Sequence, residues 1–113
     1  MVFRHYRGTE PPQFAHESER EVALLLDEAG IPWLYEPKTF VLEEDDRGRA
    51  TEAFTPDFYL PDADLYVELT TMQQRLVSRK NRKVRKLREQ GEMVTILYRR
   101  DLERLRAEYG SAA

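Results

Sequence analysis

The sequence predicts an α/β fold in a single domain over residues 1–113, and three observations support this prediction. Apolar positions with a helical spacing alternate with short runs of aromatic and branched residues typical of strands, and no repeat interrupts them. A length of 113 residues suits one domain with a modest core. The last predicted strand follows a helical segment, which favours a parallel pairing with its neighbour.

Apolar spacing and turn residues predict the individual elements in order. Residues 1–13, which include several Arg and Pro, are expected to form an extended arm. A helix is expected over 17–29, with Ser18 and Glu21 as a capping box and Gly30 as its end. The elements expected after it are a strand over 33–42, a polar turn over 43–49, a hairpin of strands 53–60 and 64–70, a basic helix over 72–90, a strand over 93–98 and a helix over 101–109.

The predicted hairpin carries two acidic residues, Asp57 and Glu68. Asp57 follows Pro56, which cannot donate a backbone hydrogen bond and therefore favours a bend in the strand. Side-chain alternation places Glu68 on one face of its strand and Val67 and Leu69 on the other. The two acids are expected to meet at one sheet edge, where such oxygen ligands hold Mg²⁺ or Mn²⁺. The alternative is a turn-capping Asp57 and a solvated Glu68, because Pro-Asp is common in turns.

The segment 75–88 carries eight Lys or Arg and no acidic residue. Without these eight charges the net charge of −3 would be about −11. Positive charge is therefore concentrated in this segment, and the rest of the chain is acidic. Cations that no acid relieves repel one another, which favours a nucleic acid as the partner of this helix. A solvated helix face is the alternative. The residues expected to contact phosphates are Arg79, Arg82, Lys83 and Lys86.

Lys80 lies in the middle of the apolar stripe of this helix. A buried ammonium is costly without a partner, so the position has two interpretations. In the first, Lys80 reaches over the sheet edge toward Asp57 and Glu68, with Lys83 as the alternative residue for that role. In the second, its stem packs and its charged end reaches water. The stripe consists of Leu76, Val77, Val84 and Leu87.

Three short motifs resemble those of a known family between residue 14 and about residue 102. Glu19 matches an acid on the first helix, Pro56-Asp57 matches a Pro-Asp corner, and Glu68-Leu69-Thr70 matches an acid-x-Lys motif in which Thr70 replaces the lysine. These motifs are similar to those of the PD-(D/E)xK nuclease superfamily. The resemblance implies an αβββαβ restriction-endonuclease-like core, with a central mixed sheet flanked by helices. The Glu-Leu-Thr-Thr form resembles a divergent bacterial group, some members of which lie beside a purine phosphoribosyltransferase domain.

The resemblance implies a metal-dependent endonuclease that hydrolyses phosphodiester bonds of DNA, alone or as a homodimer. Its catalytic residues would be Glu19, Asp57, Glu68 and Lys80, since Thr70 cannot supply the positive charge of a lysine. Asp57, Glu68 and the Leu69 carbonyl would hold Mg²⁺ or Mn²⁺. Two alternatives stay open, a catalytically inactive module that binds nucleic acid and a regulatory domain.

Composition limits the remaining classes of function. No run is long enough for a membrane span and no signal peptide is visible, so we expect a soluble, cytoplasmic protein without a membrane partner. The absence of cysteine excludes disulfides and thiolate zinc sites. Any metal would be bound mainly through oxygen.

Overall fold

The chain forms a mixed four-stranded sheet, which confirms the predicted α/β class. The computed structural model describes residues 3–70 and 74–110. In the order β1-β4-β5-β6, the first three strands are antiparallel neighbours and β6 runs parallel to β5, as predicted. The strands are β1 Leu34–Tyr35, β4 Phe58–Leu60, β5 Leu65–Thr70 and β6 Val94–Tyr98.

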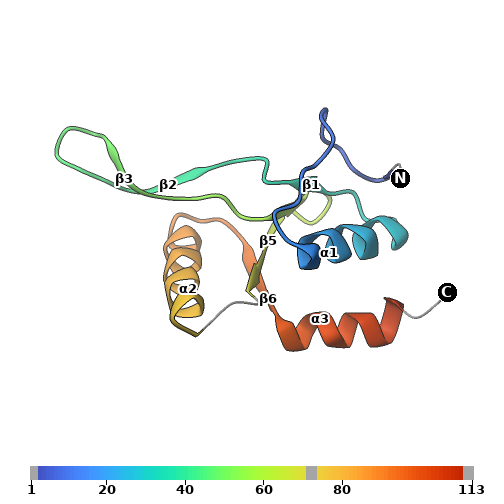
Figure 1. Ribbon diagram of the computed structural model, residues 1–113. Coiled ribbons are helices and arrows are strands. Elements are labelled where there is room, and N and C mark those ends of the chain that lie inside the picture. The colour runs from blue at the N-terminus through green and yellow to red at the C-terminus, as the bar shows by residue number, and fades with distance from the viewer. Residues whose placement is uncertain (1–2, 71–73, 111–113) are drawn as a thin grey trace.

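A separate two-stranded ribbon projects from the body of the protein (Figure 1). It consists of β2 Phe40–Glu44 and β3 Ala50–Phe54, which pair in antiparallel fashion. The turn between them is tightened by Asp45, whose carboxylate accepts hydrogen bonds from the backbone N–H groups of Arg47 and Arg49.

Helices cover both faces of the sheet (Figure 1). Helix α1 Glu17–Glu28 and helix α3 Arg99–Leu105, which continues as a π-helix over Arg106–Gly110, lie on one face. They bury Val67 and Leu69, the strand face that alternation predicted to be apolar. Helix α2 Gln74–Glu89 lies on the other face against Tyr66, together with the base of the ribbon. No helix in the described ranges is long and apolar enough to cross a membrane.

Two predicted strands are each broken into two, and the breaks lie side by side. The strand expected over 33–42 ends at Tyr35 and resumes at Phe40, and that expected over 53–60 stops at Phe54 and resumes at Phe58. Pro37 and Pro56 lie within these breaks, and neither can donate to a strand ladder. Across the gap the Glu36 N–H donates to the Asp57 carbonyl at 2.8 Å. Both strands therefore leave the sheet together and continue as the ribbon.

The first helix begins at Glu17 as predicted, but its cap and the start of the last helix differ from the prediction. His16, not Ser18, precedes the first turn of α1, and its side chain makes no capping hydrogen bond, so the expected capping box of Ser18 and Glu21 is wrong. The last helix begins at Arg99, because the Asp101 carboxylate accepts a hydrogen bond from the Tyr98 N–H at 2.8 Å and so fixes the preceding turn. The expected start of the basic helix at residue 72 lies outside the described residues.

The N-terminal arm packs closely against the body. Tyr6 forms a parallel bridge to Trp33, and the indole ring of Trp33 is fully buried among aromatic rings of the arm. Asp27 on α1 accepts hydrogen bonds from the backbone N–H groups of Arg4 at 3.0 Å and His5 at 2.7 Å, and from the indole N–H of Trp33 at 3.2 Å. One carboxylate therefore joins the arm, α1 and the start of the sheet.

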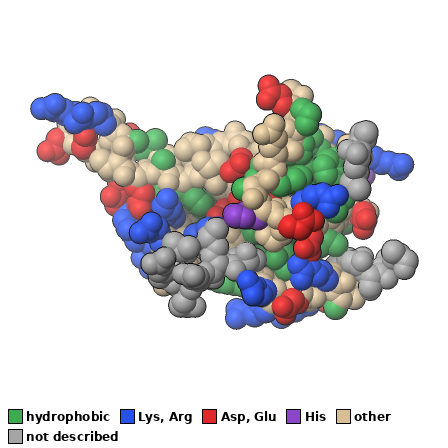
Figure 2. Space-filling view, in the orientation of Figure 1, with side chains coloured by type: hydrophobic (Ala, Val, Ile, Leu, Met, Phe, Trp, Pro, Cys, Tyr) green, Lys and Arg blue, Asp and Glu red, His purple; other side chains and the backbone are tan. Residues whose placement is uncertain are grey.

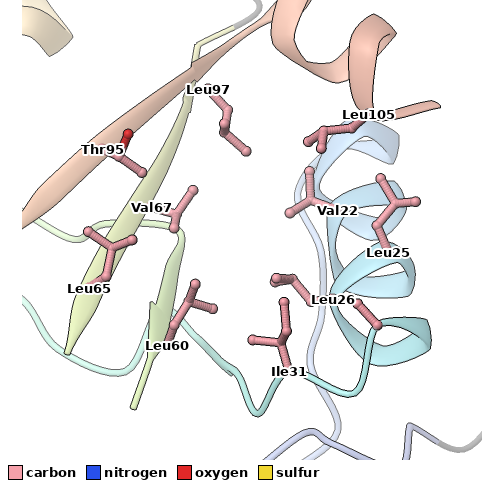
Figure 3. A pocket seen from close by; sticks show the side chains of 11 residues that line it. Val22, Leu25, Leu26, Ile31, Leu60, Leu65, Val67, Thr95, Leu97 and Leu105 are labelled. Atoms are coloured by element: carbon pink, nitrogen blue, oxygen red, sulfur yellow. The ribbon is translucent and has the colours of Figure 1, made fainter. Parts of the chain in front are cut away.

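An aliphatic groove of about 420 Å³ remains between α1 and the sheet (Figure 3). Val22, Leu26 and Ile31 face Val67 and Leu97 across it. The described side chains of its lining are apolar except for the hydroxyl group of Thr95. The groove lies on the sheet face opposite α2, so it is separate from the basic helix.

We predict that Asp27→Ala destabilises the protein by about 2 kcal/mol, because hydrogen bonds to a charged acceptor are lost. Burial raises the pKa of Asp27, but the N–H groups of Arg4 and His5 outweigh it and hold the pKa below its usual range. A depressed pKa stabilises the folded state above the ordinary pKa, and this contribution disappears as the pH falls through the folded-state pKa. In urea melts the difference in free energy of unfolding between wild type and variant should be at its full size at pH 7 and should become smaller below pH 4. A difference that does not change with pH would contradict this role.

Candidate active site

Asp57 and Glu68 lie together where the pairing of β4 with β5 ends. The Asp57 backbone N–H donates to Glu68 Oε1 at 3.0 Å, and Asp57 Oδ2 accepts the Leu69 N–H at 2.9 Å. Glu68 is only 3% exposed. These two bonds hold both carboxylates at one sheet edge, so Glu68 is not the solvated residue of the alternative interpretation, and Asp57 binds the distant Leu69 N–H instead of capping a local turn.

Lys80 reaches this edge from α2, as the first of its two interpretations predicts. Its ammonium lies 2.8 Å from Glu68 Oε2 and 2.7 Å from the Leu69 carbonyl oxygen. Val84, one turn further along α2, is fully buried and fixes this face of the helix toward the sheet. The ammonium of Lys83 takes another direction and donates to the Ala53 carbonyl at 3.1 Å.

Glu19 approaches the same region from α1 and is buried. The Tyr35 hydroxyl donates a hydrogen bond to Glu19 Oε1 and accepts one from the Ala15 N–H at 3.3 Å. The sequence analysis did not predict this role of Tyr35. The signal available was general, since a partly buried tyrosine in a strand needs a partner for its hydroxyl.

The carboxyl group of Asp57 is strongly perturbed. Burial raises its pKa first, and the nearby negative charges of Glu68 and Glu19 raise it further. The Leu69 N–H and the Lys80 ammonium act in the opposite direction but do not cancel the shift, and the pKa is about 8. Asp57 therefore holds a proton near neutral pH unless further positive charge arrives.

The donor atoms at this edge suit a hard divalent cation in type. They are two carboxylates and the Leu69 carbonyl, the oxygen ligands that Mg²⁺ and Mn²⁺ prefer. No group of three or more His, Cys, Asp or Glu side chains within residues 3–70 and 74–110 is arranged to hold a metal ion, so the carbonyl would be needed as the third ligand. Thr70, where the motif has its lysine, is buried, and its hydroxyl has no hydrogen-bond partner in the described part of the chain.

Acidic residues of the ribbon relieve part of the basic charge of α2. Lys86 forms ion pairs with Glu43 and, at 2.8 Å, with Glu52, and Arg82 lies 3.3 Å from the same Glu52 carboxylate. Basic and acidic side chains lie side by side over α2 and the base of the ribbon (Figure 2). The premise that no acid relieves these cations is therefore wrong, because the acids come from a segment distant in sequence.

Arg79 differs from the other three residues expected to contact phosphates. At about 100° per residue it shares a side of α2 with Arg82, Lys83 and Lys86. It is exposed and forms no ion pair within the described residues. Among the described residues Arg79 is thus the cation of that side with neither an ion pair nor a side-chain hydrogen bond, whereas Lys83 donates to the Ala53 carbonyl.

We predict that Asp57→Asn changes the pH dependence of stability in the absence of divalent cations. The unfolded carboxyl ionises near its ordinary pKa of 3.8, whereas the folded one keeps its proton to about pH 8, so wild-type stability falls as the pH rises through this window. An amide keeps the acceptor for the Leu69 N–H and does not titrate. The melting temperature of the variant relative to wild type should therefore rise steadily between pH 4 and pH 8.

The matched control is Asp62→Asn, the same change on an exposed turn residue. Its melting temperature relative to wild type should stay constant over this pH window. Thermal melts followed by circular dichroism measure both differences, and an equal pH response of the two variants would contradict the burial of a protonated Asp57.

Comparisons with known proteins add no assignment. No family model matches the chain, and no curated protein or solved structure matches it either.

Proposed function

We propose that this chain is a metal-dependent endonuclease that hydrolyses phosphodiester bonds of DNA. The observation that carries the proposal is the convergence of Asp57, Glu68 and Lys80 on the Leu69 peptide at one sheet edge. Two carboxylates, a carbonyl and an ammonium are the groups needed to hold a hard cation beside a phosphate. We further propose that α1-β1-β4-β5-α2-β6 is a restriction-endonuclease-like αβββαβ core, with the ribbon inserted between β1 and β4.

Asp57, Glu68 and the Leu69 carbonyl would hold Mg²⁺ or Mn²⁺. When bound, such an ion supplies Lewis-acid stabilisation of the phosphoryl oxygens and an activated water. The clamp between Asp57 and β5 orients both carboxylates in advance, so little conformational freedom is lost when a cation arrives. Glu19, held by Tyr35, adds negative charge beside Asp57 and favours a cation there.

Lys80 would supply the positive charge that Thr70 lacks. Its ammonium stands beside Glu68 on a long side chain that is about one quarter exposed, so its charge can reach a phosphate oxygen placed next to the carboxylates. A fixed cation stabilises the charge that develops during in-line attack at phosphorus. In this proposal Lys80 on α2 takes the role that the motif gives to a lysine on the strand, at the position of Thr70.

The side of α2 next to this edge would contact the DNA backbone through Arg79, Arg82, Lys83 and Lys86. In the Arg82–Glu52 and Lys86–Glu43 ion pairs one partner is about half exposed, and such pairs are weak enough for phosphates to compete with them, whereas the Lys86–Glu52 pair is more shielded. Contacts of this kind position a nucleic acid without reading its bases. A homodimer would present two such sites to the two strands of a duplex.

A second candidate is a catalytically inactive module that binds nucleic acid. The observation that favours it is the Glu68–Lys80 ion pair, which balances one carboxylate without any metal. A motif that carries Thr70 in place of lysine points the same way. The two candidates differ in turnover, which is directly measurable.

The deciding experiment is cleavage of single-stranded, duplex and branched DNA and of RNA with Mg²⁺ or Mn²⁺. We expect the wild type to cleave DNA and Asp57→Asn to be slower by about 100-fold or more, because a metal ligand is removed. Asp62→Asn, purified in the same way, should cleave as fast as the wild type, and a loss of cleavage in Asp57→Asn alone would exclude a contaminating nuclease as the source of activity. Salt-sensitive binding of DNA without cleavage would support the inactive module.

We predict that Arg79→Gln weakens binding of a DNA duplex and lowers the slope of log affinity against log salt by about 1, since one phosphate contact is lost. Arg85→Gln is the matched control, because Arg85 is also exposed but lies on a different side of α2. Fluorescence anisotropy at several salt concentrations measures both slopes. Equal effects of the two substitutions would show that the basic helix attracts DNA only through its overall charge.

A further inference from the structure

We infer that Lys80 is a displaceable counter-ion, which a divalent cation must move from Glu68 and the Leu69 carbonyl before it can bind. The inference rests on the proposed function and adds a form of regulation to the same site. It makes the binding of metal and the binding of a phosphate mutually dependent through one side chain.

The first step is that Lys80 occupies the oxygen atoms a metal would need. Glu68 Oε1 already accepts the Asp57 N–H, so Oε2 is the less occupied oxygen of this carboxylate and the better ligand for a cation. Lys80 lies 2.8 Å from that oxygen and 2.7 Å from the Leu69 carbonyl, the other expected ligand. An ammonium and a metal ion cannot share this position.

The second step is that the ammonium balances the site when no metal is bound. A nearly fully buried carboxylate such as Glu68 is costly without a cation, and Lys80 provides the positive charge at this edge. The stem of Lys80 is anchored on α2, but its side chain is 24% exposed and can extend toward solvent. A divalent ion that replaces the ammonium beside Glu68 would repel the ammonium toward solvent.

The third step concerns the destination of the ammonium. Arg79, next to Lys80 in the same turn of α2, is exposed and forms no ion pair within the described residues. A phosphate held near Arg79 would therefore receive the displaced ammonium as a second cation. Because each ligand then favours the state that the other requires, metal and polyanion should bind with positive cooperativity.

The test measures Mn²⁺ affinity by electron paramagnetic resonance for wild type, Lys80→Met and Arg85→Met. Arg85→Met is the matched control, since it also removes one positive charge from α2, but from an exposed position on a different side of the helix and outside the proposed contacts to metal and DNA. We expect Lys80→Met to bind Mn²⁺ about tenfold more tightly and Arg85→Met to change the affinity far less. If Lys80→Met does not fold, Lys80→Gln, neutral but polar, serves in the same comparison.

A second measurement repeats the Mn²⁺ titrations with a duplex that carries non-cleavable phosphorothioate linkages. The duplex should tighten Mn²⁺ binding in wild type and in Arg85→Met, and clearly less in Lys80→Met, which has no ammonium to transfer. Unchanged or weaker Mn²⁺ binding in Lys80→Met, or equal tightening by the duplex in all three proteins, would overturn the displacement and leave the proposed nuclease intact. Absence of Mn²⁺ binding in every variant would overturn both.

Discussion

The reciprocal clamp between Asp57 and β5 is the interaction on which the rest of the structure depends. The backbone ladder between β4 and β5 ends at the pair Phe58 and Val67. Beyond that pair, side chains replace the backbone, since Asp57 Oδ2 accepts the Leu69 N–H and Glu68 accepts the Asp57 N–H. Buried backbone donors must find acceptors, and here the acceptors are carboxylates. The pairing of β4 with β5 thus ends in two fixed acids, while β5 continues beside β6 as far as Thr70.

The same break directs the chain away from the sheet and over α2. Because Pro37 and Pro56 interrupt two paired strands at one level, the strands continue together as a ribbon that carries Glu43 and Glu52 to the basic helix. The backbone feature that creates the acidic site therefore also sets the electrostatic state of the neighbouring helix. A change at the break would affect both surfaces together.

Local patterns predicted the parts of the structure that local forces determine. Alternation gave the faces of β5, Pro56 indicated a bend, and the helical crossover indicated the parallel pairing of β5 and β6. The division of strands between sheet and ribbon was missed, because it depends on two breaks meeting in space. The ion pairs of Arg82 and Lys86 were missed for a similar reason, since their partners lie 30 and 43 residues away. For Lys80, helical phase limited the interpretations to two, and only the packing of α2 selects between them.

The protonation state of Asp57 bears on whether the site is structural or functional. A carboxyl group whose pKa is about 8 is neutral at pH 7 and accepts the Leu69 N–H no better than an asparagine amide would. An asparagine would avoid the cost of placing a second acid beside Glu68, so a purely structural role gives no reason for an acid at position 57. The acid becomes an advantage only when additional positive charge enters, because the charged form is then favoured. We therefore propose that the acid at position 57, beside the Glu68–Lys80 ion pair, serves to bind a cation that would favour its charged form.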